Sequence, residues 1–297
     1  GVRVLMGRAQ FQDAHHVVVT LPDNVQEMLE ASATIIATGS RPAAVPVLEG
    51  ARSSAEALAA AAVPKSLLIV GAGAIGVEFA CIYSGFGSKV TLVEAMDNIL
   101  PQGDVEISQG LAWLLQKRGI EILTSSIVMG RDGKKIHVKT QEGERTIAAE
   151  RMLVAVGRKP CTEGLQLDVA GVRLSDQGGI AVDERLRTDV EGIYAVGDVT
   201  GRHFLAHSAF AEGGVAAENA AGRYARIRYD ALPSCVYGLP EVASVGLSEQ
   251  EARAHGGDVQ VGRVAWTISE KALIEGETDG MVKVVARDGQ LLGLHII

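Results

Sequence analysis

The chain of 297 residues carries 28 Lys and Arg against 36 Asp and Glu, which gives a formal net charge of −8. This charge disfavours nucleic acids and anionic membranes as partners, and no apolar run approaches the roughly 18 residues that span a bilayer. No signal peptide is evident, so we expect a cytoplasmic protein with two or three domains. Cys81, Cys161 and Cys235 form neither a CxxC nor a CxxxxC pair, and each is expected to be a small buried residue.

The first segment predicts β structure that ends on a glycine. A strand is expected over His16–Leu21, before the turn Pro22-Asp23-Asn24, and residues 33–42 form an apolar run that ends in Ala-x-Gly with a Pro three residues later. Residues 151–160 repeat this pattern 118 residues further on, after another β-rich stretch over Lys135–Thr140. Such a period fits a duplicated domain. The alternative is that parallel strands ending in glycine simply look alike.

Residues 66–94 follow the pattern of a dinucleotide-binding βαβ unit. A buried strand (Ser66–Val70) precedes Gly71-Ala72-Gly73-Ala74-Ile75-Gly76, and a helix (Val77–Gly85) and a second strand (Lys89–Val93) follow. The first glycine permits a tight turn, the second lets a pyrophosphate approach the backbone, and the third lets helix and strand pack closely. The helix N-terminus would then face the phosphates. The alternative is an ordinary glycine-rich turn.

The acid that ends this unit indicates which dinucleotide is bound. Glu94 lies 18 residues after Gly76, where a carboxylate can accept both ribose hydroxyls of the adenosine half. A 2′-phosphate beside Glu94 would place like charges together, and Ala95-Met96 offers no Arg to receive it. We therefore expect NAD(H) rather than NADP(H).

The next predicted elements are a capped helix and a strand that ends in Gly-Asp. Asp104 is expected to cap a helix that is closed by Gly119. Thr188–Asp198 is a turn and an apolar strand with Gly197-Asp198 at its carboxyl end, where cofactors lie in open α/β sheets. A helix of small residues (His207–Gly222) follows, and its N-terminus could face a flavin pyrimidine. His203 and His207 have the spacing of metal ligands, but no third ligand is near, so no metal site is predicted.

Five motifs together resemble the flavin- and NAD-dependent disulfide reductases, and among them the enzymes that oxidise dihydrolipoamide. The resemblance covers essentially the whole chain. The motifs are Ile-Ile-Ala-Thr-Gly-Ser-Arg-Pro (35–42), Gly-Ala-Gly-Ala-Ile-Gly-Val-Glu (71–78), Tyr-Ala-Val-Gly-Asp (194–198), Leu-Ala-His (205–207) and Pro-Glu-Val-Ala-Ser-Val-Gly-Leu (240–247).

The resemblance implies two cofactors, FAD and NAD, and assigns residues to each. For FAD, the loop that passes the cofactor is Thr38, Gly39 and Ser40. The Asp on the flavin ribityl chain, with its preceding Gly, is Gly197-Asp198. The segment under the flavin ring is Phe204, Leu205, Ala206 and His207. For NAD they are the glycine-rich turn with the ribose acid, and two residues beside the adenine and nicotinamide: Gly71, Ala72, Gly73, Ala74, Ile75, Gly76, Val77, Glu94; Val128 and Gly157. Glu78 matches an acid that pairs in relatives with a lysine near the flavin, and no such lysine is identifiable here.

Other parts of the family pattern have no counterpart in residues 1–297. They are the first glycine fingerprint, the redox-active cysteine pair and the C-terminal His-Glu dyad, so no catalytic residue is predicted. The chain is expected to be truncated at both ends. The implied fold is α/β with two Rossmann-like domains and a truncated α+β dimerisation domain. Its predicted parts are an FAD domain (1–63 and 160–229), an inserted NAD domain (64–159) and a dimerisation domain (230–297).

The resemblance also implies a reaction. The intact protein would be a homodimer that oxidises dihydrolipoamide, carried on a lipoyl domain of a 2-oxo-acid dehydrogenase complex. Electrons would pass through a disulfide and FAD to NAD⁺. Three alternatives stay open: another disulfide reductase of the mercuric or glutathione type, an NADH oxidase or ferredoxin reductase-like enzyme, and a non-catalytic nucleotide-binding protein.

Overall fold

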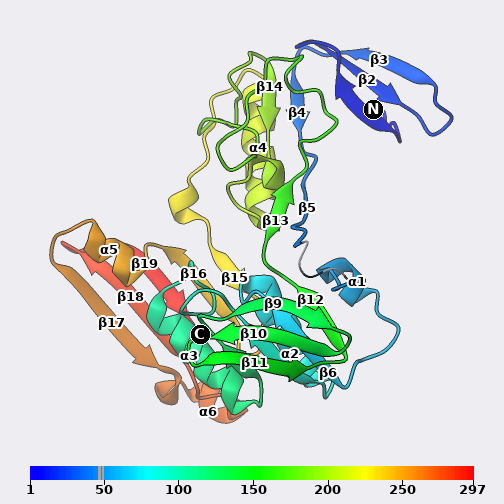
Figure 1. The fold of residues 1–297 in the computed structure, drawn as a ribbon. Coiled ribbons are helices and arrows are strands. Elements are labelled where there is room, and N and C mark those ends of the chain that lie inside the picture. The colour runs from blue at the N-terminus through cyan, green and yellow to red at the C-terminus, as the bar shows by residue number, and fades with distance from the viewer. Residues whose placement is uncertain (46–47, 49) are drawn as a thin grey trace. The chain divides into compact units, whose positions relative to one another are not determined.

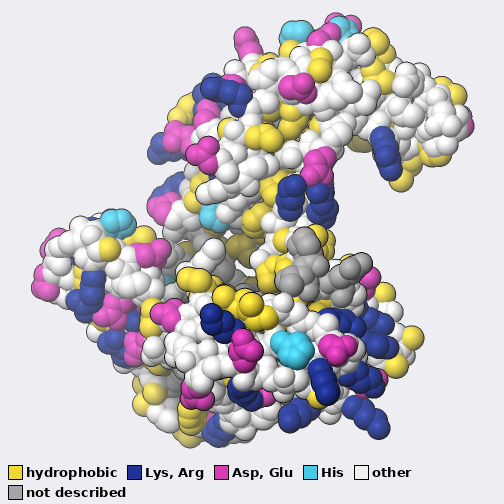
Figure 2. Space-filling view, viewed as in Figure 1, with side chains coloured by type: hydrophobic (Ala, Val, Ile, Leu, Met, Phe, Trp, Pro, Cys, Tyr) yellow, Lys and Arg dark blue, Asp and Glu magenta, His cyan; other side chains and the backbone are white. Residues whose placement is uncertain are grey.

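The computed structural model describes residues 1–45, 48 and 50–297, and contacts among them divide the chain into two compact units (Figure 1). Unit 1 joins Gly1–Arg41 to Arg158–Tyr229, and unit 2 joins Pro42–Gly157 to Asp230–Ile297. No helix in the described part of the chain is both long and apolar enough to cross a membrane. In Figure 2, acidic and basic side chains are mixed over most of the drawn face, while Lys and Arg side chains gather at its lower right.

Unit 1 consists of short strands and one long helix. Strands β1–β3 form an antiparallel sheet, and β4 pairs in parallel with β14, with Thr34 opposite Ile193. A core that includes Phe11, Ile36 and Ile180 lies beneath these strands. The elements are β1 (Arg8–Phe11), β2 (His16–Thr20), β3 (Gln26–Glu30), β4 (Thr34–Ile36), β5 (Ser40–Pro42), β13 (Arg158–Pro160), β14 (Ile193–Ala195), the 3-10 helix η2 (Gly197–Thr200) and α4 (Ala206–Ala220).

The helix expected over His207–Gly222 is α4, which starts one residue earlier and ends two residues earlier. Gly222 takes a φ of +79°, a left-handed conformation that ends helices and that glycine adopts at little cost. Gly222 therefore ends α4 and is not itself part of the helix.

The first part of unit 2 is a parallel sheet with crossover helices. Its strands lie in the order β12-β6-β7-β8, and helices α2 and α3 connect successive strands. Beside it, β9–β11 form an antiparallel sheet. The elements are α1 (Ser54–Leu58), β6 (Ser66–Val70), α2 (Ala74–Gly85), β7 (Lys89–Val93), α3 (Val105–Lys117), β8 (Glu121–Leu123), β9 (Ile127–Asp132), β10 (Lys135–Thr140), β11 (Gly143–Ala148) and β12 (Arg151–Val154).

Several of these elements have the predicted bounds. Strands β6, β7 and β10 coincide with the expected ranges, and Asp104 caps α3. Helix α2 starts at Ala74, three residues before the expected position, because Gly73 and not Gly76 is the N-cap. The third glycine of the turn therefore lies inside the first turn of the helix.

The second part of unit 2 is a five-stranded antiparallel sheet in the order β15-β16-β19-β18-β17. Its buried Val236, Val242 and Ile297 belong to the same core as Ile69 and Leu111, so this sheet packs onto the parallel-sheet part. The helix expected over Ser248–His255 is α5, while the short α6 was not predicted. The elements are η3 (Tyr229–Ala231), β15 (Ser234–Val236), β16 (Val242–Gly246), α5 (Glu249–Ala254), β17 (Val259–Ala265), η4 (Trp266–Ile268), α6 (Glu270–Glu275), β18 (Met281–Arg287) and β19 (Gln290–Ile296).

Candidate functional site

The glycine-rich turn between β6 and α2 accepts only glycine at two of its positions. Gly71 takes a φ of +96°, and a Cβ there would lie 2.5 Å from the carbonyl oxygen of Ala155. A Cβ on Gly76 would lie 1.9 Å from the carbonyl oxygen of Gly71. A Cβ on Gly73, in contrast, would meet no atom within 4 Å. The turn is therefore tightly packed against the protein at Gly71 and Gly76, and it leaves open space at Gly73, where a pyrophosphate can approach the backbone.

The N-terminus of α2 opens onto this turn. No side chain bonds the N–H groups of its first turn, since the N-cap is Gly73. Unpaired N–H groups and the positive end of a helix dipole bind anions such as pyrophosphate. Ala72 and Val77 are fully buried, so they hold the turn in place without offering side chains to a ligand. The turn and first helical residues thus group seven of the predicted NAD positions: Gly71, Ala72, Gly73, Ala74, Ile75, Gly76 and Val77.

Glu94 is held against the same turn. Its Oε2 accepts the Ala72 N–H at 2.6 Å and its Oε1 accepts the Met96 N–H at 2.9 Å, and the side chain is buried. Each carboxylate oxygen has a further lone pair, so the carboxylate can still accept hydroxyl donors. The acid predicted for the ribose and the turn predicted for the phosphates are therefore joined by a direct hydrogen bond.

Val128, Gly157 and Glu78 are the other residues predicted at the NAD site, and each has a different environment. Val128 is on β9, and its side chain is buried in a core with Ile136 and Val138, so only its backbone could face a ligand. Gly157 takes a φ of +121°, and its carbonyl accepts the Ala43 N–H at 3.0 Å. No partner is identifiable for Glu78 from the sequence, but its Oε1 accepts the Tyr237 N–H at 2.9 Å. This acid is thus tied to the second part of unit 2.

In unit 1 the predicted FAD residues Ser40 and Asp198 are in contact. Ser40 Oγ donates to Asp198 Oδ2 at 2.5 Å, and Arg158 Nε donates to Ser40 Oγ at 2.6 Å. Thr38 donates from Oγ1 to the Cys161 carbonyl at 2.7 Å. Gly39, with a φ of +73°, borders open space. The loop after β4 and the Gly-Asp after β14 therefore meet, as parallel neighbouring strands require.

A buried acid supports the Gly-Asp turn, and the sequence reasoning missed it. Glu212 on α4 is fully buried, and its Oε2 accepts the Gly197 N–H at 2.5 Å. Its Oε1 accepts the Tyr229 hydroxyl at 2.9 Å. Burial, helped by the Glu212 carboxylate, raises the pKa of Tyr229 to about 12. Glu212 thus fixes the backbone immediately before Asp198.

The segment Phe204–His207 leads into the N-terminus of α4. The N-cap, Leu205, gives no side-chain hydrogen bond, and Ser208 Oγ in the first turn is buried without a partner. Buried polar groups normally have hydrogen-bond partners, so the Ser208 hydroxyl and the free N–H groups at the start of α4 can bind the polar edge of a ligand ring. Phe204 and Ala206 lie on either side of the N-cap. His203, just before the segment, stacks on Tyr229 at 4.7 Å between ring centroids, and burial lowers the pKa of His203.

The three cysteines are free, partly buried thiols. Cys81 Sγ accepts the Leu239 N–H at 3.3 Å, and burial raises the pKa of this thiol. A thiol with a raised pKa is a poor nucleophile at neutral pH. Within the described ranges, no group of three or more His, Cys, Asp or Glu side chains is arranged to hold a metal ion.

Comparison with protein families gives matches over nearly the whole chain. The profile described as pyridine nucleotide-disulphide oxidoreductase matches residues 1–213, and the profile of the dimerisation domain of these proteins matches residues 232–297.

Individual proteins agree with this. The chain is 41% identical to dihydrolipoyl dehydrogenase of Thermus scotoductus and 37% identical to that of Bacillus subtilis, with 100% of this chain and 66% of each relative covered. Among solved structures, LpdA from Mycobacterium tuberculosis matches with a TM-score of 0.91 and 28% identity, over 100% of this chain and 68% of that one. The HOCl-induced flavoprotein disulfide reductase RclA from Escherichia coli matches with a TM-score of 0.85 and 28% identity, over 98% and 68%. The chain spans about two thirds of the length of the curated relatives it matches.

Proposed function

The chain belongs to the pyridine nucleotide-disulphide oxidoreductase family, and from this premise we propose that it forms the nucleotide-binding and dimerisation parts of a dihydrolipoyl dehydrogenase. Membership of the family implies FAD and NAD(H) as cofactors. The relatives named dihydrolipoyl dehydrogenase are the basis for choosing this reaction within the family.

The observation that carries the proposal is the hydrogen bond between Glu94 and the glycine-rich turn. It places a carboxylate beside the open position at Gly73 and the uncapped N-terminus of α2. The turn and helix receive the pyrophosphate, and Glu94 receives the adenosine ribose hydroxyls. A 2′-phosphate would meet a like charge there, so NADH is preferred to NADPH.

The residues of unit 1 fit a flavin in the same manner. Asp198 accepts a hydrogen bond from the ribityl chain, and Ser40 with Arg158 holds that carboxylate in place. The orphan Ser208 hydroxyl and the uncapped α4 N-terminus suit the polar edge of the flavin pyrimidine. When bound, FAD and NAD⁺ supply the electron relay and the hydride acceptor for oxidation of a dithiol.

The proposal extends to domains and partners. We assign residues 1–63 and 160–229 to the FAD domain, 64–159 to the NAD domain and 230–297 to the dimerisation domain. The end of the first FAD segment packs with unit 2, since unit 1 stops at Arg41 and Ala57 on α1 lies in the core of the parallel-sheet part. The matched dimerisation profile supports a homodimer. The proposed substrate is dihydrolipoamide, presented on a lipoyl domain of a 2-oxo-acid dehydrogenase complex in the cytoplasm.

A different disulfide reductase, of the mercuric or glutathione type, is the second candidate. The similarity to the RclA structure supports this second candidate, because RclA is a disulfide reductase of the same fold. The two are separated by assaying the complete gene product with NADH and lipoamide, and with NADPH and glutathione disulfide. Lipoamide reduction by NADH is expected. Turnover of glutathione disulfide alone would transfer the proposal to the second candidate.

The nucleotide site is tested directly in residues 1–297 by titration with NADH, followed by nicotinamide fluorescence. Gly73→Ala adds a Cβ into open space without a clash in the protein, so the variant folds but blocks the approach of the pyrophosphate. Gly85→Ala is the matched control, because it makes the same change at the other end of α2, also with no atom within 4 Å. We expect lost affinity only in Gly73→Ala. Equal NADH affinity in both variants would overturn the assignment of this turn.

A further inference from the structure

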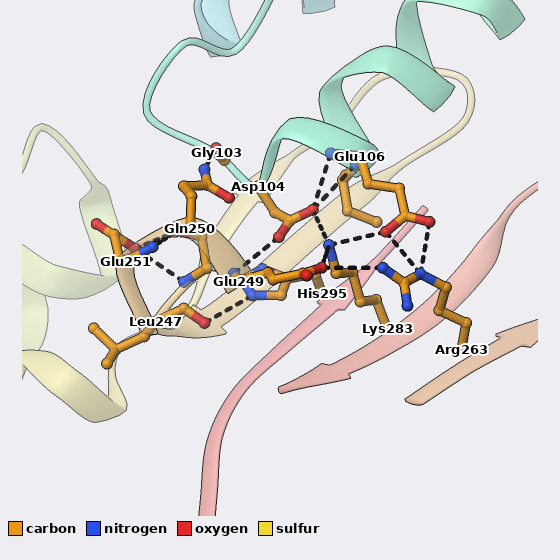
Figure 3. Close-up of polar contacts among 12 residues, drawn as sticks. Gly103, Asp104, Glu106, Leu247, Glu249, Gln250, Glu251, Arg263, Lys283 and His295 are labelled. Atoms are coloured by element: carbon orange, nitrogen blue, oxygen red, sulfur yellow. Dashed lines mark hydrogen bonds and ion pairs between the residues drawn. The ribbon is translucent and has the colours of Figure 1, made fainter. Parts of the chain in front are cut away.

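A buried lysine joins the two parts of unit 2. Lys283 on β18 has a side chain that is 2% exposed, and its Nζ lies 2.8 Å from Asp104 Oδ1. Glu106 Oε2 and Glu249 Oε2 each lie 2.9 Å from the same nitrogen (Figure 3). Buried lysines occur in proteins only where their charge is paired. Here the partners come from α3 of the parallel-sheet part and α5 of the dimerisation part.

Arg263 forms the outer layer of this cluster. Its Nε donates to Glu106 Oε1 at 2.7 Å and its Nη2 to Glu249 Oε2 at 3.0 Å, whereas Asp104 interacts with it only through the longer-range charge attraction (Figure 3). The Arg263 side chain is 43% exposed. Lys283 is therefore the inner cation of the cluster, and Arg263 is its solvent-exposed counterpart.

Asp104 organises the start of two helices. It is the N-cap of α3, and its Oδ1 accepts the Glu106 N–H at 3.1 Å. Its Oδ2 accepts the Glu249 N–H at 3.1 Å, at the start of α5. This carboxylate is fully buried, so without Lys283 it would be an uncompensated charge in the interior.

The segment before Asp104 runs directly back to the predicted nucleotide turn. Leu100 N–H donates to the Ala72 carbonyl at 2.8 Å, and Ala72 N–H donates to Glu94. At the other end, Gln250 Nε2 donates to the Gly103 carbonyl at 2.9 Å. The loop of residues 95–103 is thus fixed to the glycine-rich turn through Leu100 and to the dimerisation part through Gly103.

This loop holds a strained residue. Leu100 takes a φ of +45°, a left-handed conformation that costs a branched side chain energy and persists only where surrounding contacts enforce it. The enforcing contacts are the Leu100 N–H bond to the Ala72 carbonyl, the bonds that the Leu100 carbonyl accepts from Gly103 N–H at 2.8 Å and Ser108 Oγ at 3.3 Å, and the anchorage of the loop at Asp104. Loss of the anchorage would let the loop relax away from the turn.

We propose that Lys283 is a positioning residue for NAD(H), which fixes Asp104 and thereby holds loop 95–103 and the Glu94–Ala72 contact in the geometry that receives the adenosine half. The inference rests on the proposed function, and it adds a residue of the dimerisation part to the support of the nucleotide site. Lys283 itself does not touch the cofactor.

Lys283→Met in residues 1–297 is the test, with NADH and ADP-ribose as probes at a temperature where circular dichroism shows the chain to be folded. Both probes contain the adenosine half, so both should bind about three- to tenfold more weakly, by the same factor. Arg263→Met is the matched control, because it removes hydrogen bonds to two of the same carboxylates, those of Glu106 and Glu249, but leaves the bond between Lys283 and Asp104. Its affinity should stay within about twofold of the unchanged chain.

A double variant covers the case in which Lys283→Met does not fold. In Lys283→Met/Asp104→Asn the unpaired charge of Asp104 is gone and Asn still caps α3, but its amide nitrogen faces the Glu249 N–H, so the bond to α5 is lost. The double variant should fold, and it should still bind NADH more weakly than the unchanged chain, because the anchorage of loop 95–103 is not restored. NADH affinity equal to that of the unchanged chain, in folded Lys283→Met or in the double variant, would overturn the inference alone, and so would equal losses in Lys283→Met and Arg263→Met. Failure of the unchanged chain to bind NADH would overturn the proposed function and the inference with it.

Discussion

The hydroxyl of Ser40 donates a 2.5 Å hydrogen bond to the carboxylate of Asp198, although 158 residues separate the two in the sequence. Ser40 follows the loop after β4, and Asp198 is the second residue of η2, which follows β14, the parallel neighbour of β4. Arg158 adds a second bond to Ser40 through its Nη2, at 3.0 Å to the carbonyl. The Asp198 carboxylate is therefore already oriented by the protein.

Asp198→Ala is expected to weaken flavin retention. A charge-assisted hydrogen bond contributes about 1.5–3 kcal/mol, so the affinity should fall by about one to two orders of magnitude. The measurement is the visible absorbance that stays with the complete gene product after gel filtration. Asp176→Ala, at an exposed turn of the same unit, is the control and should retain flavin normally. Unchanged retention in Asp198→Ala would exclude Asp198 as a ribityl contact.

Glu212→Ala should destabilise the chain strongly. The change leaves the Gly197 N–H and the Tyr229 hydroxyl without their acceptor, and each buried unsatisfied group costs about 1–3 kcal/mol. Urea unfolding measures the loss, and Glu212→Gln should recover part of it because the amide oxygen can still accept. Glu218→Ala, exposed on the same helix, should change the free energy of unfolding by less than about 0.5 kcal/mol. Similar losses in both alanine variants would show that Glu212 has no special role.

Acid should weaken the Lys283 cluster. Burial alone would raise the pKa of Asp104, but the bonds from Lys283 and the Glu249 N–H outweigh it and hold this pKa below its ordinary value. The hydrogen bond from Arg263 lowers the pKa of Glu106, and the hydrogen bond from Lys283 lowers the pKa of Glu249. A carboxylate whose pKa is lower in the folded state stabilises the fold above its unfolded-state pKa, about 4, and loses this contribution as the pH falls through the folded value.

The stability difference between the unchanged chain and Lys283→Met should therefore be largest near pH 7 and narrow toward pH 3. In the variant, protonation relieves the unpaired charge of Asp104, while in the unchanged chain it breaks the ion pairs. Urea midpoints at pH 7, 5, 4 and 3 measure this. A difference that stays constant with pH would show that the loss comes from packing and not from charge.

Residues 1–297 alone are expected to give no NADH-dependent reduction of lipoamide. Thiol exchange needs a reactive thiolate with a second thiol nearby, whereas the cysteines here are free, and burial raises the pKa of the Cys81 thiol. The assay compares this chain with the complete gene product at equal concentration. Comparable turnover would show that the redox centre lies among these residues.

Local patterns predicted the elements of the nucleotide-binding part well. β6 and β7 are apolar runs bounded by glycine or charge, and Asp104 gives a clear capping signal, so their bounds follow from neighbouring residues. The start of α2 was misplaced because a glycine inside a helical turn reads locally as part of the loop. The six residues of α6 are too few for a periodic pattern, although Ser269 caps them.

Long-range contacts between charged residues escaped the sequence reasoning. Glu212 and Lys283 carry charges that are normally solvated, and nothing beside them in the sequence indicates burial. Their partners lie far along the chain, as Asp104 does from Lys283. The contact between Glu78 and Tyr237 is hidden for the same reason, since it depends on how the second part of unit 2 packs onto α2.

We expect the Glu94 carboxylate to make residues 1–297 selective for NAD(H), and the direct measurement is a pair of dissociation constants, for NADH and for NADPH. We predict that NADH binds at least about tenfold more tightly than NADPH. The repulsion between a 2′-phosphate and the buried Glu94 carboxylate should cost at least about 1.4 kcal/mol, which corresponds to this factor. Glu94→Ala should weaken NADH binding and narrow this preference. Glu94→Gln should also narrow it, and it keeps the bond from the Ala72 N–H while its amide nitrogen faces the Met96 N–H and loses that second bond. Equal affinities of the unchanged chain for NADH and NADPH would contradict this role of Glu94.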